Sequence, residues 1–450
     1  MHRLVINQLG PIEYCELECS KFMTFTGFQA SGKSTIAKAI YYFRTVKDDI
    51  LLLAKKRAFN ISQANGFAKK QRTSQGIDLT DEVKNYLGEK FLRTFGASSN
   101  TYAKTSMEYA YTEKCSIKVL LHNNVREENQ NYIEVIFSNE LEKFLTDHNS
   151  CFAATSLGIP ENEENLFREE MENLFDDVYS VVFIPAGRSI LTLLSQQLSY
   201  IYATMDDSQK RSLDICTKDF IERILVLKPL FSDKMQRLKS YSNLLHQSQA
   251  NVWKKYSIAG KDARILMKKI LRGDYSYEDG EEHIVLENGE CVKLSFASSG
   301  QQESVWILNL LYYYLLGNKK VLFIIEEPES NLFPESQKYI TELIALVSNC
   351  GHSVVMTTHS PYVLGTLNNL LYANTLKEGY AEKADKIISQ NLWLDEKDFD
   401  SWFVKEGKIE NCMDSEIHMI QNERIDGISS VINDDFGKLL EIQNMDEEGA

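Results

Sequence analysis

Apolar and polar residues follow several distinct periods along this 450-residue chain, and these periods predict its elements. Residues 2–26 form short alternating runs, broken at Leu9-Gly10-Pro11 and at Ser20, which predicts strands. Ser34–Arg44 repeats its apolar residues at helical spacing, and residues 45–100 are predicted to be mainly helical. The chain therefore opens with strands, a glycine-containing loop and a helix.

The middle of the chain changes from strand to helix periodicity. Residues 107–138 alternate in the runs MEYAYT, CSIKVLLH and YIEVIF, with Asn123-Asn124 as a turn, which predicts an antiparallel sheet. Residues 192–272 carry apolar side chains at helical spacing, and Pro229 and Gly260 are expected to break the run. The apolar positions are Phe220, Ile224, Leu227, Met235, Leu238 and Leu245. We interpret this region as a compact helical insert.

The last third predicts an α/β core. A hairpin is expected over residues 283–297, turning at Asn288-Gly289, and a helix over 300–316. The runs VLFII at 321–325 and SVVMTTH at 353–359 are almost wholly apolar, which is typical of strands covered on both faces of a parallel sheet.

These patterns divide the chain into four parts. We assign 1–190 and 283–410 to one α/β head, 191–282 to the helical insert and 411–450 to an acidic tail whose last residues are predicted to be disordered. The fold class is α/β, with a mixed sheet core, an antiparallel β subdomain and the compact helical insert.

Composition narrows the choice of compartment and partner. The net charge of −15 repels nucleic acid and acidic membranes unless basic residues gather locally. The sequence has neither a secretory layout at its start nor an apolar run of roughly 20 residues, so we expect a cytoplasmic protein without a membrane partner. Eight cysteines at irregular positions are interpreted as reduced thiols.

A glycine-rich loop supplies the first candidate chemistry. Residues 27–34, GFQASGKS, match the P-loop pattern between a predicted strand and a predicted helix. Backbone N–H groups of such a loop close on phosphates, the lysine reaches the β and γ oxygens, and the serine hydroxyl can bind magnesium. The predicted ATP-binding residues are Gly27, Gln29, Ala30, Ser31, Gly32, Lys33, Ser34 and Thr35.

The two buried strands end in groups that complement this loop. Glu326 and Glu327 follow VLFII directly; Glu326 is predicted to reach magnesium and Glu327 to polarise the attacking water. His359 ends the next apolar run and could contact a γ-phosphate. The alternatives are a solvated loop start for the carboxylates and a structural role for the histidine.

Together these residues resemble soluble ABC-type ATPases, the branch that includes SMC-like, RecF-like and OLD-type proteins. EEPESNLFPESQ is similar to their Walker B and D-loop, TTHSPYVL to their His switch and FASSGQQES to their signature, in the family's order along the chain. The resemblance implies ATP and Mg²⁺ as cofactors and a head-to-tail homodimer, or a higher even-numbered homo-oligomer, in which the signature caps the partner's ATP. Those signature residues are Ser298, Ser299, Gly300 and Gln301; a helix N-cap is the alternative for either serine.

Three features depart from the family pattern or have no assigned place in it. Glu326 stands where many members have aspartate, and the Q-loop has only distant candidates at Gln63 and Gln71. Arg188, in VVFIPAGRS, is expected either to touch phosphate or to brace the interface between lobes.

The resemblance extends to the stand-alone ATPases of bacterial anti-phage systems such as Septu and PARIS. It implies a sensor or regulator of a separately encoded effector, a nuclease of HNH or toprim type. The alternatives are a RecF-like or SMC-like DNA repair ATPase and a scaffold that assembles on ATP with little turnover. DNA or RNA is a candidate partner through four basic segments, for which solvated helix faces are the alternative: Lys55-Lys56-Arg57, Lys69-Lys70-Gln71-Arg72, Lys254-Lys255 and Lys268-Lys269.

Overall fold

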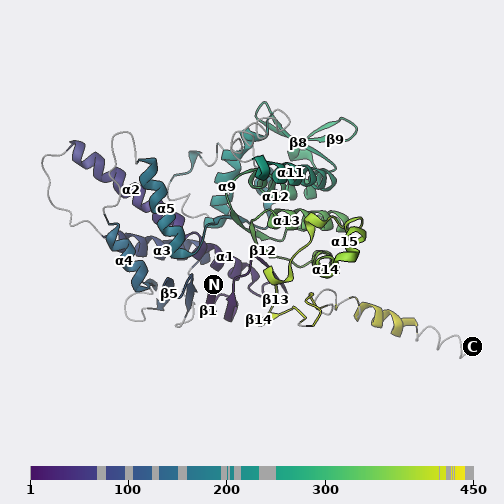
Figure 1. Cartoon of the computed structure of the whole chain (residues 1–450), viewed down its shortest axis with the longest axis horizontal. Coiled ribbons are helices and arrows are strands. Elements are labelled where there is room, and N and C mark those ends of the chain that lie inside the picture. Colours follow the sequence, from purple (N-terminus) through teal and green to yellow (C-terminus); the bar gives the residue numbers. More distant parts are fainter. Residues whose placement is uncertain are drawn as a thin grey trace, which may run out of the picture.

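A computed structural model gives the fold of the chain. It describes residues 2–67, 78–96, 105–123, 131–149, 160–193, 200, 203–206, 214–232, 250–414, 416–421, 427, 429 and 431–440. Within these ranges the protein is the predicted α/β structure, with a mixed sheet at its centre and an antiparallel sheet beside it (Figure 1).

The central sheet has six strands in the order β14-β13-β3-β12-β11-β7. Five of them run parallel, and β14 pairs antiparallel with β13 at the edge. The predicted strands at the glycine loop and at the two apolar runs are confirmed as β3, β11 and β12. The bounds are β3 Phe22–Gly27, β7 Ser180–Ile184, β11 Val321–Glu326, β12 Ser353–Thr357, β13 Phe399–Lys405 and β14 Lys408–Asn411.

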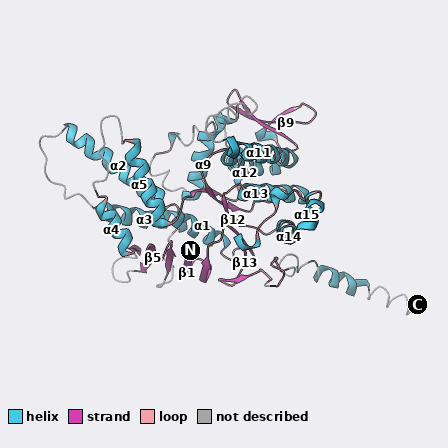
Figure 2. Cartoon of the chain, in the orientation of Figure 1, coloured by secondary structure: helices cyan, strands magenta, loops and turns pink. Residues whose placement is uncertain are grey.

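Both faces of this sheet are buried, as the apolar runs predict. Along β11, Val321, Phe323 and Ile325 pack into one core, while Leu322 and Ile324 pack into the other. Helix α1 (Lys33–Arg44) covers the second face. Helices α12 (Ser299–Leu316), α13 (Pro334–Asn349) and α14 (Pro361–Thr375) cover the first, and Figure 2 shows these layers on either side of the strands.

The N-terminal sheet has five antiparallel strands in the order β2-β1-β4-β5-β6. The antiparallel sheet predicted for 107–138 is therefore confirmed, and the first two strands of the chain extend it. Their bounds are β1 Arg3–Leu9, β2 Ile12–Glu18, β4 Ser106–Ala110, β5 Ser116–Asn123 and β6 Asn131–Phe137. The helices of this lobe are α2 Val46–Phe67, α3 Leu79–Phe95, α4 Asn139–Asp147 and α5 Glu161–Phe175.

The predicted helical insert begins within α6 (Arg188–Leu193) and contains α9 (Ile215–Leu227), the 3-10 helix Lys228–Phe231 and α11 (Ala250–Leu271). The expected break at Gly260 is wrong, because α11 runs through it. A Cβ at residue 260 would lie 2.8 Å from Leu316 Cδ2, so the glycine lets α12 approach closely. Met235, Leu238 and Leu245 lie outside the described residues.

The predicted hairpin belongs to a three-stranded sheet, β10-β9-β8. β9 (Glu281–Leu286) and β10 (Cys291–Lys293) enclose the expected Asn288-Gly289 turn, but the second strand is shorter than predicted, because Leu294–Phe296 is a 3-10 helix. β8 (Gly273–Glu278) was not predicted, and it places a strand inside the region assigned to the helical insert.

The C-terminal part continues with α15 (Glu378–Asp385) and the 3-10 helices Gln390–Leu392 and Glu396–Asp398. Residues 431–440, in the predicted acidic tail, are helical and at least partly exposed throughout. Figure 1 shows this helix away from the body, in yellow. Residues 441–450 lie outside the described residues. No described helix has both the length and the apolar character that a bilayer span requires. The seven cysteines that the structure describes are all free.

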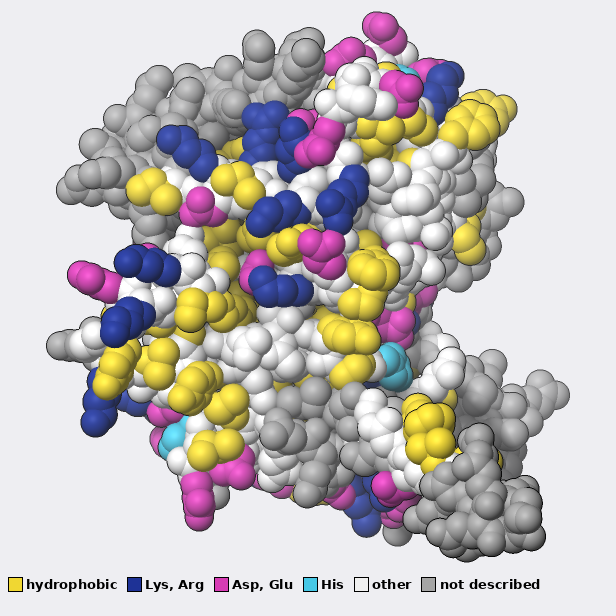
Figure 3. Space-filling view, turned by 90° about the vertical axis from the view of Figure 1, so that its right-hand side faces the viewer, with side chains coloured by type: hydrophobic (Ala, Val, Ile, Leu, Met, Phe, Trp, Pro, Cys, Tyr) yellow, Lys and Arg dark blue, Asp and Glu magenta, His cyan; other side chains and the backbone are white. Residues whose placement is uncertain are grey.

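Where the basic segments that could contact nucleic acid are described, acidic side chains pair with several of their lysines and arginines. Lys55 pairs with Glu164, Arg57 with Glu82 and Lys268 with Asp274. Lys269 lies over the Tyr339 ring. On the side that carries the C-terminal elements, Figure 3 shows Lys and Arg side chains interspersed with Asp and Glu side chains. The segment 69–72 and the side chains of Lys254 and Lys255 lie outside the described residues.

Candidate nucleotide site

The predicted motifs meet at one edge of the central sheet. β3, β12 and β11 are neighbours, and they end at Gly27, Thr357 and Glu326. Because these strands are parallel, their carboxyl ends lie at the same edge, which is where open α/β sheets bind ligands. The loop before Lys33, the paired carboxylates and His359 therefore come together, although more than 300 residues separate the first from the last.

The glycine loop has a backbone that side chains would disturb. Gly27 has a φ of 139°, and a Cβ there would lie 2.2 Å from the Val404 carbonyl oxygen of β13. Gly32 has a φ of 111°, and its Cβ would lie 2.3 Å from Ile12 Cδ1. These two glycines let the chain turn tightly from β3 into α1, whose first N–H groups are free of intrahelical partners.

Lys33 begins α1 and its ammonium group lies inside the loop. Its Nζ donates to the carbonyl oxygens of Gly27, at 3.1 Å, and Phe28, at 2.7 Å. Burial lowers the pKa of Lys33, opposed by the charges of Glu327 and Glu329. The cation is thus placed between the loop and the carboxylates at the strand ends.

The other predicted phosphate-binding residues surround this lysine in the chain. Gln29, Ala30 and Ser34 are exposed at the site, whereas the Ser31 hydroxyl is buried without a hydrogen-bond partner. Thr35 Oγ1 lies near the backbone of Gly10, since a Cβ on that glycine would be 3.7 Å away. Thr35 therefore also faces the β1–β2 turn.

Glu326 ends β11 with a carboxylate that is only half satisfied. Its Oε2 accepts a hydrogen bond from the Ala186 N–H at 3.2 Å, while its Oε1 is buried without a partner. A buried carboxylate oxygen without a donor fits a cation ligand. Among the described residues no group of three His, Cys, Asp or Glu side chains could hold a metal by itself. This donor set fits Mg²⁺, which usually binds through one or two carboxylates plus substrate phosphates.

Glu327 has a strained backbone and an accessible carboxylate. Its φ is 43°, in the left-handed region that non-glycine residues seldom adopt. Its N–H donates to the Thr357 carbonyl at 3.0 Å, and its Oε2 accepts from Ser330 Oγ at 3.2 Å. This strain turns adjacent glutamates toward different surroundings at the strand end.

His359 lies beside Glu327 and the glycine loop. Its Nε2 is 3.6 Å from Glu327 Oε1. Burial and the Lys33 charge lower the pKa of His359, while Glu327 and a hydrogen bond with the Gly27 backbone raise it. The net shift is downward, so the imidazole is mainly neutral at pH 7.

Glu329 is a site residue to which no role was assigned from the sequence. Its buried Oε1 accepts hydrogen bonds from Thr358 Oγ1 at 2.7 Å and from the His359 N–H at 2.8 Å. Burial raises the pKa of Glu329, and these hydrogen bonds oppose the rise. It joins the loop after β11 to the loop after β12. In the sequence, Glu329 is marked only by being the third acidic residue of the run EEPE at 326–329.

The predicted signature residues form the start of α12. Ser298 is the N-cap: its Oγ accepts from the Gln301 N–H at 3.3 Å, and Gln301 Oε1 accepts from the Ser298 N–H at 3.0 Å. A Cβ at Gly300 would lie 2.6 Å from the Asn331 carbonyl oxygen, so this glycine allows close contact with the loop after β11. Ser299 is exposed. In the described part of the chain no hydrogen bond or ion pair joins Ser298–Gln301 to residues 27–35.

Arg188 occupies the bracing position rather than a phosphate-facing one. Its side chain is fully buried, and its guanidinium donates to the carbonyl oxygens of Glu326, at 2.7 Å, and Glu327, at 3.0 Å. Burial lowers the pKa of Arg188, and nearby carboxylates oppose this shift; arginine nevertheless keeps its charge in proteins. Of the Q-loop candidates, Gln71 and the Gln63 side chain lie outside the described residues.

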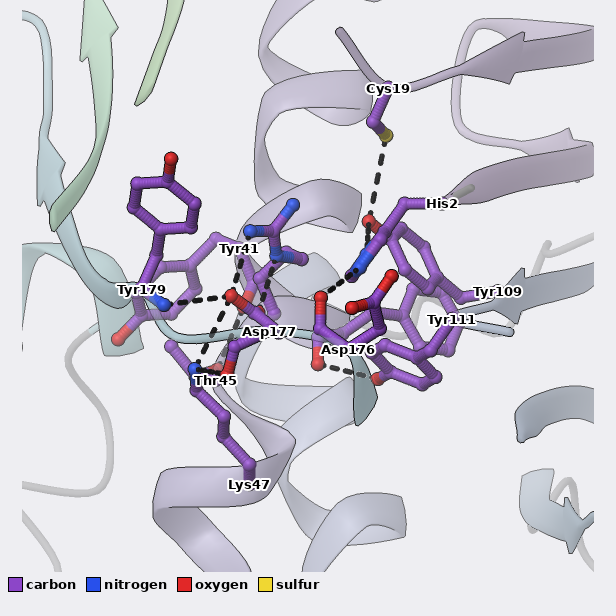
Figure 4. A network of polar contacts seen from close by, with 12 residues as sticks. His2, Cys19, Tyr41, Thr45, Lys47, Tyr109, Tyr111, Asp176, Asp177 and Tyr179 are labelled. Atoms are coloured by element: carbon purple, nitrogen blue, oxygen red, sulfur yellow. Dashed lines mark hydrogen bonds and ion pairs between the residues drawn. The ribbon is translucent and has the colours of Figure 1, made fainter. Parts of the chain in front are cut away.

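A buried ion network fixes the opposite end of α1, the helix that begins with Lys33 (Figure 4). Arg44 Nε and Nη2 donate to the two Asp177 carboxylate oxygens at 2.8 and 3.0 Å, and Lys47 Nζ donates to the Asp177 carbonyl at 2.6 Å. Burial alone would raise the pKa of Asp177, but Arg44 and Lys47 hold it below its usual value. The network ties α1 and α2 to the segment that enters β7.

One protein-family model matches most of the chain. The family model described as AAA ATPase domain matches residues 1–364. None of the curated proteins matches the chain.

Three solved structures of SMC heads are similar to the chain. The SMC head bound to the C-winged helix domain of ScpA has a TM-score of 0.41 and 11% identity, covering 92% of this chain and 97% of that one. The SMC head domain from Thermotoga maritima has a TM-score of 0.34 and 13% identity, and the match covers 91% of this chain and 97% of that one. The third structure is the Pyrococcus furiosus SMC head with an extended coiled coil, bound to the C-terminal domain of ScpA. It has a TM-score of 0.37 and 10% identity, and the match covers 91% of this chain and 96% of that one. The chain belongs to the AAA ATPase domain family.

Proposed function

We propose that this chain hydrolyses ATP, and that it does so in a head-to-tail dimer whose two nucleotide sites each use residues of both copies. The observation that carries the proposal is the meeting of Lys33, Glu326, Glu327 and His359 at the carboxyl ends of β3, β11 and β12. A cation for the phosphates, a ligand for the metal and a carboxylate for the water are the parts that phosphoryl transfer to water requires.

Within one chain, different residues bind the phosphates, activate the water and contact the γ-phosphate. The loop from Gly27 to Gly32 and the start of α1 bind the phosphates through backbone N–H groups, and Lys33 neutralises the β and γ oxygens. Glu327 accepts a proton from, or orients, the attacking water. His359, held at its backbone by Glu329, contacts the γ-phosphate and its mainly neutral ring can donate one hydrogen bond there.

Ser34 and Glu326 are the residues that would hold Mg²⁺. When bound, the ion supplies charge neutralisation for the β and γ oxygens. The unpartnered Oε1 of Glu326 supports this assignment, because a buried carboxylate oxygen is stabilised by a cation or a donor.

The surface around the motifs supports a second copy as the partner. Large aromatic side chains are exposed beside four of the predicted motifs: Phe28, Phe296, Phe333 and Tyr362. Exposed apolar side chains mark an interface where they form a contiguous patch, and these four stand in the motifs proposed to face the second copy. The start of α12, a helix N-terminus that offers N–H groups, suits the γ-phosphate of a nucleotide held by that second copy.

The substitution Ser299→Glu tests the composite site. Ser299 is exposed in the first turn of α12, where an acidic side chain favours the helix, so the folded chain should keep its stability. In the dimer, however, the negative charge of this glutamate would lie against the partner's triphosphate and repel it. We expect unchanged affinity for a fluorescent ATP analogue, no ATP-dependent dimer in sedimentation and no phosphate release. Ser299→Thr, which adds no charge, is the control. Normal turnover of Ser299→Glu refutes the composite site.

The role of the cycle is proposed from the resemblance to anti-phage ATPases: control of a separately encoded effector, a nuclease of HNH or toprim type. Co-purification with the neighbouring gene products, with and without ATP, tests it. Stimulation of turnover by single-stranded or gapped DNA would instead favour a repair ATPase. ATP-dependent assembly without phosphate release would favour the scaffold.

A further inference from the structure

One buried arginine connects the two halves of the proposed dimeric site within a single chain. Arg188 lies in the segment after β7, and its guanidinium reaches the carboxyl end of β11. Nη1 donates to the Glu326 carbonyl at 2.7 Å and Nη2 to the Glu327 carbonyl at 3.0 Å. The neighbouring Ala186 N–H donates to the Glu326 carboxylate. The segment from 185 to 189 thus holds the residues proposed to act on the chain's own ATP.

The same segment is held by the signature helix. Glu303 lies one turn after Gly300 on α12, and its carboxylate accepts from the N–H groups of Arg188, at 2.9 Å, and Ser189, at 2.7 Å. Its Oε1 lies 3.3 Å from Arg188 Nη2, and its carbonyl accepts from Arg188 Nε at 3.1 Å. Side-chain exposure is 0% for Arg188 and 1% for Glu303, so water does not compete with these bonds.

These contacts leave the arginine no role at a phosphate. Nε, Nη1 and Nη2 all donate to groups of the chain itself, and the side chain has no exposed surface. What Arg188 does control is the backbone of Glu327, whose φ of 43° is unfavourable and must be held by its surroundings. A shift of α12 is therefore passed through Glu303 and Arg188 to the strained residue.

Resting on the proposed function, we propose that Arg188 and Glu303 couple the two ATP sites of the dimer. When the start of a chain's α12 closes over the partner's nucleotide, the helix moves as a unit, and this pair repositions Glu326 and Glu327 against the chain's own nucleotide. Both residues are positioning residues. The consequence is that each site turns over faster when the other is engaged, so that turnover depends on ATP with positive cooperativity.

The test compares Glu303→Gln and Arg188→Lys with the wild type. The wild type should show a Hill coefficient well above 1, toward its limit of about 2 for two sites. Both variants should bind the fluorescent ATP analogue within about threefold of the wild type, give a Hill coefficient near 1 and lose about tenfold in kcat. Arg188→Lys keeps the charge but loses the fork that reaches both carbonyls.

Arg223→Lys is the matched control. Arg223 is partly buried, with 27% side-chain exposure, and it also ties α12 and a central strand together, through Tyr314 and the Val181 carbonyl. Val181 lies near the start of β7 and Tyr314 near the end of α12, far along both elements from the site. This variant should lose stability comparably and keep the wild-type Hill coefficient.

A second measurement does not depend on turnover. With a non-hydrolysable ATP analogue, dimer formation should change amide hydrogen exchange over residues 326–330 in the wild type. The change should be absent in Glu303→Gln dimers, although the analogue is bound. If Arg188→Lys fails to fold, Glu303→Gln alone decides.

The outcomes separate this inference from the function on which it rests. A wild type that neither dimerises nor hydrolyses ATP overturns both. A hydrolysing dimer with a Hill coefficient of 1, or folded Arg188→Lys and Glu303→Gln variants with wild-type cooperativity and exchange, overturns the coupling alone.

Discussion

Glu329 offers a sharp test of how the site is held together. It is 8% exposed, and its Oε1 accepts from Thr358 Oγ1 and from the His359 N–H. Glu329→Ala leaves one buried donor, the Thr358 hydroxyl, and one part-buried donor, the His359 N–H, without acceptors. Each unsatisfied donor costs about 1–3 kcal/mol, so with partial relaxation the loss should be about 2–4 kcal/mol of unfolding free energy.

Glu329→Gln is the matched variant, because its amide oxygen can accept both hydrogen bonds. Burial raises the pKa of Glu329 above its unfolded value of 4.5, so the folded chain holds this proton more tightly than the unfolded chain. Stability from this group is present at low pH and is lost as pH rises through the folded pKa. Glutamine lacks this loss, but its NH2 group takes the place of Oε2, which is buried without a hydrogen-bond partner. At pH 7 Glu329→Gln should therefore be clearly more stable than Glu329→Ala and close to the wild type.

Denaturant unfolding at pH 7 measures the stabilities, and phosphate release measures the function. Glu329→Ala should also lower turnover roughly 10-fold or more, because the His359 backbone is released, while Glu329→Gln should retain most of it. A loss below about 0.5 kcal/mol for the alanine variant would refute the hydrogen-bond account. Equal losses in both variants would show that the charge, and not the acceptor, matters.

Three further predictions follow from single contacts. Glu327→Gln should bind ATP and accumulate as a closed dimer, with turnover reduced about 10²-fold or more, as measured by phosphate release and sedimentation; normal turnover would move the general base elsewhere. Gly27→Ala should destabilise the fold by about 3 kcal/mol in denaturant, since its Cβ would meet the Val404 carbonyl, whereas Gly365→Ala, with open space, should not. Burial lowers the pKa of His352 from 6.5 to about 4, so its contribution to stability is intact above 6.5 and falls as pH drops toward 4. Between pH 7 and pH 5 the His352→Asn variant should therefore lose about 2 kcal/mol less unfolding free energy than the wild type. If both proteins lose the same amount over this range, His352 is not the source of the loss.

The sequence identified the elements whose residues carry a strong local signal. The apolar runs at β11 and β12 were predicted because burial on both faces leaves few polar residues in a strand. The glycine loop before α1 was predicted because its residue pattern matches a P-loop. β8 was missed because GDYSYE is polar, and its pairing with β9 is a tertiary effect. The predicted break at Gly260 is wrong, because this glycine accommodates the close approach of Leu316, more than 50 residues away in the chain.

The site residues were predictable in type, whereas their connections were not. Motif spacing placed Lys33, Glu326, Glu327 and His359, and strand order in the fold brought them to one edge. The bracing position of Arg188 depends on Glu303 and Glu326, which lie 115 and 138 residues further along the chain. Ser298 is an N-cap in the fold, which is one of the two roles predicted for it. Its second role, toward a partner's ATP, stays a prediction.

Mixing two inactive variants tests the central claim most directly. Lys33→Ala should fail to bind ATP at its own loop, and Ser299→Glu should fail to cap a partner's ATP. A mixed dimer retains one intact site, built from the loop of the Ser299→Glu copy and the signature of the Lys33→Ala copy. The account predicts that mixing equal amounts restores part of the wild-type phosphate release, up to roughly a quarter, where each variant alone has none. A mixture that stays as inactive as its components would contradict a nucleotide site shared between two copies.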